Sequence, residues 1–337
     1  MEKIPVFAGL DYHQDPVQVC VMDTGGRLLA NRSCRNDWRA IRDEAERHGR
    51  VVRAAIEACT GAANLAEQLV EQAGWHVDQA HPGYVSRMKQ GPDKSDFTDA
   101  RMLADLTRVG YLPRVWLPPQ EVRDLRLLVR YRQQLANARR NAKLRIGAIL
   151  REQRSGQGGS HRWTKAWIHW VKEAAPMSEQ ARWVLLEHFE ELDSLNARLR
   201  KVEDRLEELT RDDRVVRRLV KIKGIGPVTA WTLRAMVGRF DRFKSGKQLS
   251  RFCGLSPCNA SSGARQADAG LVKAGDPMLR SVLIEAAHGL MRYDPHWQSL
   301  ATRMREAGKK TSVIAAAVAN RWMRRLFHEM QPERWVA

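Results

Sequence analysis

The acidic residues that could do chemistry in this chain begin with Asp96 and Asp99, within the stretch Lys-Ser-Asp-Phe-Thr-Asp-Ala that starts at Lys94. Residues three apart share one face of a helix, so the two carboxylates would point the same way. Mg²⁺ takes oxygen ligands, usually one or two carboxylates together with phosphate oxygens. For this pair alone, a helix start is the favoured interpretation, with Asp96 as the cap and Asp99 favoured by the helix dipole. The positions of the other acids decide between these interpretations.

Two further acids follow segments that are predicted to be strands. The apolar segment 6–10 ends at Asp11, and the apolar segment 51–56 ends at Glu57. If these strands are neighbours, Asp11 and Glu57 end side by side, and the helix that begins near Asp96 can lie across them. Four carboxylates so placed, with no basic partner, would repel one another strongly unless cations neutralised them. We therefore predict a site for two Mg²⁺ ions roughly 4 Å apart, an arrangement that serves phosphoryl transfer.

The elements that must position these acids follow a mixed α/β pattern. Strands in a meander, followed by strands that alternate with helices, predict one α/β domain over residues 1–112. Its predicted elements are three short strands within 6–32, a helix over 37–47, a strand over 51–57, a helix over 61–74, a strand near 76–79 and the helix that carries Asp96 and Asp99.

Residues 113–210 are predicted to form a linker, 113–119, and then a helical arm. The helix over 123–154 carries ten Lys and Arg against two acids, and leucines at heptad spacing mark a coiled-coil seam over 178–210. This seam pairs either with the preceding basic helix or with a second subunit. The cations that we expect to contact nucleic acid in this arm include Arg139, Arg140 and Lys143.

Three tryptophans fall on one helical face between these two long helices, at positions 163, 167 and 170. Aromatic rings of this kind stack on bases in nucleic-acid-binding proteins. Packing in a core is the favoured interpretation here, because tryptophan is a large apolar side chain.

The net charge of +18 is concentrated in the second part of the chain. Residues 1–110 hold 14 Lys and Arg against 16 Asp and Glu, whereas the remainder carries a net charge of +20. Such a balance indicates a polyanionic partner, and nucleic acid is favoured over membrane because no amphipathic anchor stands out. No apolar run is long enough for a transmembrane helix, no signal peptide is evident, and the five cysteines form no zinc set. We expect a cytoplasmic protein with reduced thiols.

Residues 211–337 are predicted to be mainly helical. The segment 219–230 has the form of a helix-hairpin-helix, whose Gly-Ile-Gly turn lets backbone N–H groups approach a phosphate. A Ser-Ser-Gly turn follows at 261–263; read alone it is a surface turn, because no nearby His or Asp would activate a serine. The cations and glycines that we expect to contact nucleic acid here are Lys221, Lys223, Gly224, Gly226, Arg265 and Lys273.

In this fixed order, the motifs resemble those of the insertion-sequence transposases of family IS110, to which the pilin-gene invertases also belong. The resemblance covers nearly the whole chain and rests on the segments 9–11, 56–58, 94–100, 224–226, 252–257, 262–263 and 273–276. It implies a RuvC-like (RNase H-like) N-terminal domain whose Asp-Glu-Asp-Asp set binds Mg²⁺, at Asp11, Glu57, Asp96 and Asp99.

The resemblance also implies a C-terminal transposase domain whose serine attacks DNA to form a phosphoserine link. The matching position is Ser262, with Ser261 as the alternative. Members of the family are guided by a structured bridge RNA that pairs with donor and target DNA. A homo-oligomer, a dimer or a tetramer, would join the two domains in one composite site.

Two other classes of function stay open at this point. A RuvC-like nuclease that hydrolyses junctions would need the four acids but not Ser262, and a nucleic-acid-binding scaffold would need neither. An actin-like ATPase also begins with a strand that ends in Asp, but residues 11–14 lack the glycines that would cradle phosphates.

Overall fold

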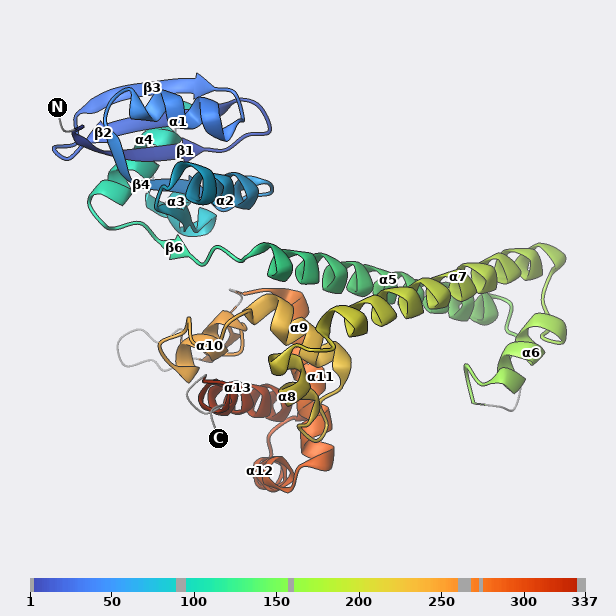
Figure 1. Cartoon of the computed structure of the whole chain (residues 1–337). Helices are drawn as coiled ribbons and strands as arrows, with labels where there is room; N and C mark the ends of the chain where they lie inside the picture. The colour runs from blue at the N-terminus through green and yellow to red at the C-terminus, as the bar shows by residue number, and fades with distance from the viewer. Residues whose placement is uncertain (1–2, 89–94, 157–160, 260–267, 273–274, 332–337) are drawn as a thin grey trace. The chain divides into compact units, whose positions relative to one another are not determined.

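The computed structural model describes residues 3–88, 95–156, 161–259, 268–272 and 275–331. The chain forms two compact units, Met1–Pro119 and Gln120–Ala337 (Figure 1). The predicted boundary between arm and C-terminal domain, near residue 210, lies inside the second unit and stays a prediction. Within the described segments, every helix is too short or too polar to cross a lipid bilayer.

The first unit is built on a six-stranded mixed sheet with the strand order β3-β2-β1-β4-β5-β6. Strand β1 pairs antiparallel with β2 and parallel with β4, β4 pairs parallel with β5, and β6 adds an antiparallel edge. This order is RNase H-like, which confirms the predicted mixed α/β class. The strands are β1 (Pro5–Asp11), β2 (Val17–Asp23), β3 (Leu28–Cys34), β4 (Arg50–Glu57), β5 (Val77–Ala80) and β6 (Arg114–Val115).

Helices cover the two faces of this sheet. Because side chains alternate along a strand, Leu10 and Ile56 enter one core with helices α1 (Trp38–Glu46) and α2 (Ala62–Ala73). Their neighbours Ala55 and Cys20 face the other way, toward helix α4 (Asp96–Arg108). The short helix α3 (Pro82–Met88) joins that second side through Val85. Asp11 and Glu57, each one residue beyond a side chain of the first core, therefore belong to the face that α4 covers.

Helix α4 approaches β1 so closely that only glycine fits at the contact. A Cβ atom at Gly9 would lie 2.0 Å from the carbonyl oxygen of Ala100 and 2.4 Å from the amide nitrogen of Ala104. Ala100 and Ala104 are fully buried and pack with Cys20 and Met22 of β2. Small residues on both elements thus set the height of α4 above the sheet.

The second unit begins with two long helices that pair antiparallel, α5 (Gln120–Glu152) and α7 (Glu179–Thr210), joined through α6 (Lys165–Glu173). Arg132 on α5 contacts Glu203 at 2.7 Å, and Arg145, further along α5, contacts Glu191 at 3.3 Å. The leucine seam of α7 is therefore paired with the preceding basic helix of the same chain, one of the two arrangements predicted. We call α5, α6 and α7 together the arm.

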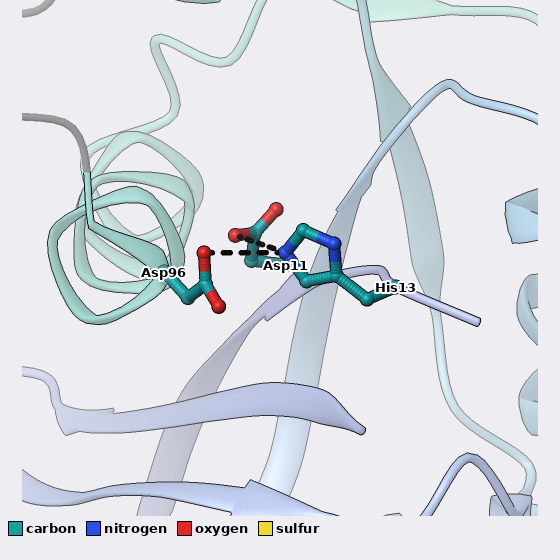
Figure 2. Close-up of side chains that lie close together, drawn as sticks. All are labelled: Asp11, His13 and Asp96. Atoms are coloured by element: carbon teal, nitrogen blue, oxygen red, sulfur yellow. Dashed lines mark ion pairs between the residues drawn. The ribbon is translucent and has the colours of Figure 1, made fainter. Parts of the chain in front are cut away.

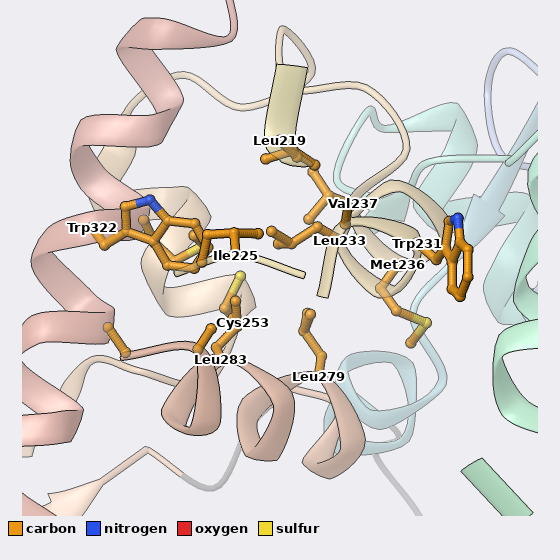
Figure 3. Packing of buried hydrophobic residues seen from close by; sticks show 14 of the residues in the cluster. Leu219, Ile225, Trp231, Leu233, Met236, Val237, Cys253, Leu279, Leu283 and Trp322 are labelled. Atoms are coloured by element: carbon orange, nitrogen blue, oxygen red, sulfur yellow. The ribbon is translucent and has the colours of Figure 1, made fainter. Parts of the chain in front are cut away.

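The rest of the second unit is a helical core around α9 and α11, which Figure 3 shows. Leu233 and Leu279 are fully buried there, and Trp322 of the last helix closes one side. The elements are α8 (Arg214–Val220), α9 (Pro227–Val237), α10 (Gly246–Phe252), β7 (Pro257–Asn259), β8 (Asp268–Leu271), α11 (Pro277–Tyr293), α12 (Pro295–Glu306) and α13 (Thr311–Glu329). The predicted largely helical character of this region is confirmed.

The close contact at Gly9 generates a prediction about stability. Gly9→Ala would force β1 and α4 apart, and overpacking of this kind costs about 1–3 kcal/mol. We expect a lower midpoint of unfolding for the first unit, measured by urea titration with circular dichroism. Gly25→Ala is the matched control, because its Cβ would meet no atom closer than 3.4 Å. Equal midpoints for the two variants would contradict the account of the α4 contact.

Candidate active site

Two of the predicted acids end neighbouring parallel strands. The register pairs Leu10 of β1 with Ile56 of β4, so Asp11 and Glu57 are the next residues along both strands. The thiol of Cys59 lies near both carboxylates: burial is the main cause of its raised pKa, and the charges of Glu57 and Asp11 add to the rise. The predicted side-by-side placement of Asp11 and Glu57 is therefore present.

The other two acids lie in the first turn of α4. Ser95, and not Asp96, caps this helix: its hydroxyl accepts a hydrogen bond from the amide of Thr98 at 3.2 Å, and Thr98 Oγ1 accepts one from the Ser95 amide. The interpretation of Asp96 as the cap is wrong, because the serine directly before it provides a complete capping box. Neither carboxylate caps the helix, although each is favoured by the helix dipole.

Hydrogen bonds at both ends of α4 fix where its first turn lies on the sheet. Asn31 of β3 donates to the carbonyl of Phe97 at 2.9 Å, and its own side chain accepts from Gln18 of β2 at 2.7 Å. At the far end, Arg108 donates to the carbonyl of Thr24 at 3.3 Å. Gln18 is the register partner of Asp11, so this network positions the helix start next to the end of β1.

His13 lies between Asp11 and Asp96, as Figure 2 shows. Its Nε2 atom is 3.3 Å from a carboxylate oxygen of Asp11 and 3.2 Å from one of Asp96. The expectation that the acids have no basic partner is therefore wrong. The sequence contained a signal for His13, because it stands two residues after Asp11 and would face the same side of an extended chain.

The electrostatics of Asp11 reflect this crowding. Burial is the largest cause of its raised pKa, the nearby charges of Asp99 and Asp96 raise it further, and His13 opposes them. Asp99 itself is buried. The fold thus places Asp11, Asp96 and Asp99 close enough for their charges to act on one another. Glu57 ends the adjoining strand.

The donor set suits a divalent cation. Ligand atoms of Asp11, His13 and Asp96 all lie within 4.8 Å of one another, so one ion could contact all three. Carboxylate oxygens are the ligands of Mg²⁺, and a cation there would offset both the burial and the neighbouring charges of Asp99 and Asp96 that raise the pKa of Asp11. The imidazole adds a nitrogen donor, which Mn²⁺ and other transition metals accept readily.

The predicted nucleophile and two of the predicted cations, Ser262, Arg265 and Lys273, lie outside the described residues, as does Ser261. The elements on either side of them are described and meet at one place. A Cβ at Gly275 would lie 2.6 Å from the carbonyl oxygen of Phe252. Gly275 is therefore in close contact with the backbone of Phe252 and Gly254, near the paired strands β7 and β8.

The two glycines of the turn between α8 and α9 have different surroundings, one packed against α11 and one open. Gly224 has a φ of +88°, and a Cβ there would lie 2.6 Å from the backbone of Gly289 on α11, so its small size serves packing. Gly226 has no atom within 4 Å of a Cβ position and forms the open start of α9. Lys223, Gly226 and Tyr293 line the same open pocket, next to backbone amides of the helix start.

Comparisons with known proteins agree with this geometry. The sequence profile of a DEDD-type IS110 transposase domain matches residues 8–154, and that of the Transposase IS116/IS110/IS902 family matches residues 216–302. A probable family 20 transposase of Pseudomonas aeruginosa is 29% identical over 279 residues, which cover 79% of this chain and 80% of that protein. The transposase for insertion sequence element IS1111A of Coxiella burnetii is 26% identical, with 85% of this chain and 78% of that protein covered.

The transposase for insertion sequence element IS1328 of Yersinia enterocolitica is 26% identical over 80% of this chain and 81% of its own length. A DEDD nuclease domain implies a divalent metal ion, and the acids of the first unit are placed to hold one. The two profiles match the chain in order, the first across the first unit and into helix α5 and the second within the second unit, and the resemblance seen in the motifs is confirmed. The chain belongs to the IS110/IS116/IS902 family of transposases.

Proposed function

We propose that this transposase cuts and rejoins DNA with two Mg²⁺ ions held by Asp11, Glu57, Asp96 and Asp99, through a covalent link to Ser262. One observation carries the metal part of this proposal: the ends of β1, β4 and the start of α4 meet on one face of the sheet, with His13 between two of the acids. A divalent ion bound there supplies Lewis-acid polarisation of a scissile phosphate.

The residues of the chain divide the remaining work. Asp11 and Asp96 present carboxylate oxygens in fixed positions, because β1 and the capped first turn of α4 hold their backbones. His13 contacts both acids and orients them. The buried Asp99 and the strand-end Glu57 complete the acidic set. Such preorganisation is what phosphoryl transfer requires of a protein, since charge develops on the phosphate oxygens.

The covalent step conserves the phosphodiester bond. The hydroxyl of Ser262 attacks the phosphorus, the Oγ–P bond forms, and the P–O bond to the leaving strand breaks. The hydroxyl proton passes to the leaving oxygen, so that strand ends in a free hydroxyl that can later attack the phosphoserine in reverse. Ser261, its neighbour, is the alternative nucleophile.

The basic second unit suits the nucleic-acid partners that the family resemblance implies. A structured bridge RNA, paired with donor and target DNA, would lie against the net charge of +20 beyond residue 110. The open start of α9, with Lys221 and Lys223 before it, is a suitable contact for a DNA phosphate, as in a helix-hairpin-helix. A dimer or tetramer working on DNA in the bacterial cytoplasm would bring the RuvC-like acids of one subunit to the serine of another.

Removal of one acid tests the metal site. Asp11→Asn is expected to abolish stabilisation by Mn²⁺, whereas the wild-type protein gains about 2.7 kcal/mol at an ion concentration 100 times the Kd. Thermal unfolding with and without the ion measures this gain. Asp43→Asn is the control, since Asp43 contacts Arg42 on the surface of α1. An undiminished gain in Asp11→Asn would remove Asp11 from the ligand set.

The two glycines of the α8–α9 turn should respond differently to an added methyl group. Gly224→Ala clashes with Gly289 and should lower stability by about 1–3 kcal/mol. Gly226→Ala should fold normally but bind DNA roughly ten- to 150-fold more weakly, because hydrogen bonds to a charged phosphate contribute about 1.5–3 kcal/mol. Fluorescence anisotropy with labelled duplex DNA measures the second effect. Full affinity in a folded Gly226→Ala would exclude this helix start as a phosphate contact.

The nucleophile is tested with end-labelled DNA, the flanking RNA of the element, Mg²⁺ and purified protein on a denaturing protein gel. Label attached to the wild-type protein, retained in Ser261→Ala and lost in Ser262→Ala, is the expected result. Loss in Ser261→Ala alone would assign the nucleophile to Ser261. Cut DNA without any adduct would show a hydrolytic nuclease that uses the acids and no serine.

A further inference from the structure

The arm contains a pocket whose lining includes the three arm cations that are expected to contact nucleic acid. Its lining includes the side chains of Arg139, Arg140, Lys143, Arg151, Arg162 and Trp163, and it encloses about 300 Å³. This volume is at the lower end of the range for small-molecule sites, roughly 300–1,000 Å³. No lining residue described by the structure is acidic. We call this site the arm pocket.

The cations of the arm pocket are poorly compensated. The Nζ atom of Lys143 lies 4.5 Å from the centre of the Trp163 ring, a cation–π contact. Burial lowers the pKa of Lys143, and the neighbouring charge of Arg139 lowers it further. A bound anion would relieve both effects, because an opposite charge stabilises the protonated amine.

The aromatic wall of the pocket is built against local conformational preference. Trp163 has a φ of +70°, a region that bulky side chains rarely enter and that costs on the order of 1–3 kcal/mol. It directly precedes Thr164, whose hydroxyl caps α6 by accepting from the Trp167 amide. The ring stands 5.0 Å from that of Trp167 and is only partly buried. Because the Trp163 side chain is only partly buried, its packing does not by itself account for the unfavourable positive φ angle.

Trp167 forms the buried inner wall of the pocket. It lines the pocket and is 2% exposed, yet its indole Nε1 donor has no hydrogen-bond partner among the described residues. Buried donors of this kind are normally satisfied. This nitrogen is itself covered, so a ligand in the pocket does not reach it, and Trp167 serves as the buried support behind the ring of Trp163.

The floor of the pocket is also unusual for its element. Gly147 lies inside α5, within its last two turns, and glycine in a helix interior costs about 1 kcal/mol relative to alanine. A Cβ there would touch only the guanidinium of Arg151, at 3.6 Å, so no packing contact requires the glycine. The missing side chain keeps the pocket open.

We propose that the arm pocket binds one unpaired nucleotide, with its base against Trp163 and its flanking phosphates on the surrounding arginines and Lys143. Aromatic rings within a cationic groove are the common means of holding single-stranded nucleic acid. A ring inside a pocket is reached by an unstacked base and not by a base within a duplex. The proposal rests on the nucleic-acid binding proposed above, but it is independent of the metal centre.

The test uses the full-length protein in EDTA, so that no strand is cut, and a short fluorescein-labelled single-stranded RNA of mixed sequence. Three further probes are the same RNA with abasic sites, the DNA of the same sequence and the matching duplex. Anisotropy at one fixed salt concentration gives each affinity, because phosphate contacts are salt-dependent.

Three substitutions address the pocket. Trp163→Ala should weaken binding of the single strand roughly five- to 150-fold, the range for one stacked base, while Trp163→Phe should retain most of the affinity. Gly147→Leu should weaken binding similarly by filling the pocket, and it should not unfold the arm, because it raises helix propensity. Trp183→Ala and Arg200→Gln are matched controls on exposed positions of α7 and should bind like wild type.

Each outcome decides the proposal. The proposal is supported if Trp163→Ala and Gly147→Leu bind the intact single strand more weakly than the wild-type protein does, and if neither substitution changes the affinity for the abasic RNA. Tighter binding of RNA assigns the nucleotide to RNA, and tighter binding of DNA assigns it to a displaced DNA strand. Unchanged affinity in a folded Gly147→Leu, equal losses in Trp183→Ala, or full affinity of the wild-type protein for abasic RNA would overturn it. The DNA adduct assay on the same variants separates this failure from failure of the proposed recombination chemistry.

Discussion

The acidic site depends on the contact between Gly9 and the backbone of α4. Any side chain at position 9 would push the helix away from the sheet, because the nearest atoms are a carbonyl oxygen and an amide nitrogen that cannot rotate aside. Gly9 and Asp11 lie on the same face of β1, two residues apart. The contact between Gly9 and Ala100 fixes the distance of α4 from the sheet. It therefore also sets the distance of Asp96 and Asp99, in the preceding turn, from Asp11.

The rest of the first unit supports this contact. Parallel pairing of β1 with β4 brings Glu57 to the same edge, and the Asn31 and Arg108 hydrogen bonds hold the two ends of α4. Burial first, and then the charges of Asp99 and Asp96, raise the pKa of Asp11, so the ionised carboxylates are unfavourable in this place by themselves. A bound cation would neutralise these negative charges and so stabilise the arrangement.

Much of this arrangement could be predicted from the residues, because strand and helix periods place Asp11, Glu57, Asp96 and Asp99 without knowledge of distances. His13 was not predicted as their partner, since its reach to Asp96 depends on where α4 crosses the sheet. The capping interpretation of Asp96 placed the cap of α4 one residue late, because Ser95 and Asp96 are both good capping residues. The role of Gly224 needed the structure as well: its neighbour Gly289 is far away in sequence and comes close through packing of α11. The tryptophans of the arm were assigned to packing, which holds for Trp167 but leaves the backbone of Trp163 unexplained.

The most direct test of the central claim is to locate a metal ion. Crystals of the wild-type protein grown with Mn²⁺ would give an anomalous difference map from which ion positions are read without reference to any assumed ligand. The account predicts a peak between the ends of β1 and β4 and the first turn of α4, within coordination distance of Asp11 and Asp96. Ordered crystals with saturating Mn²⁺ and no peak at these residues, or with the ion bound elsewhere, would contradict it.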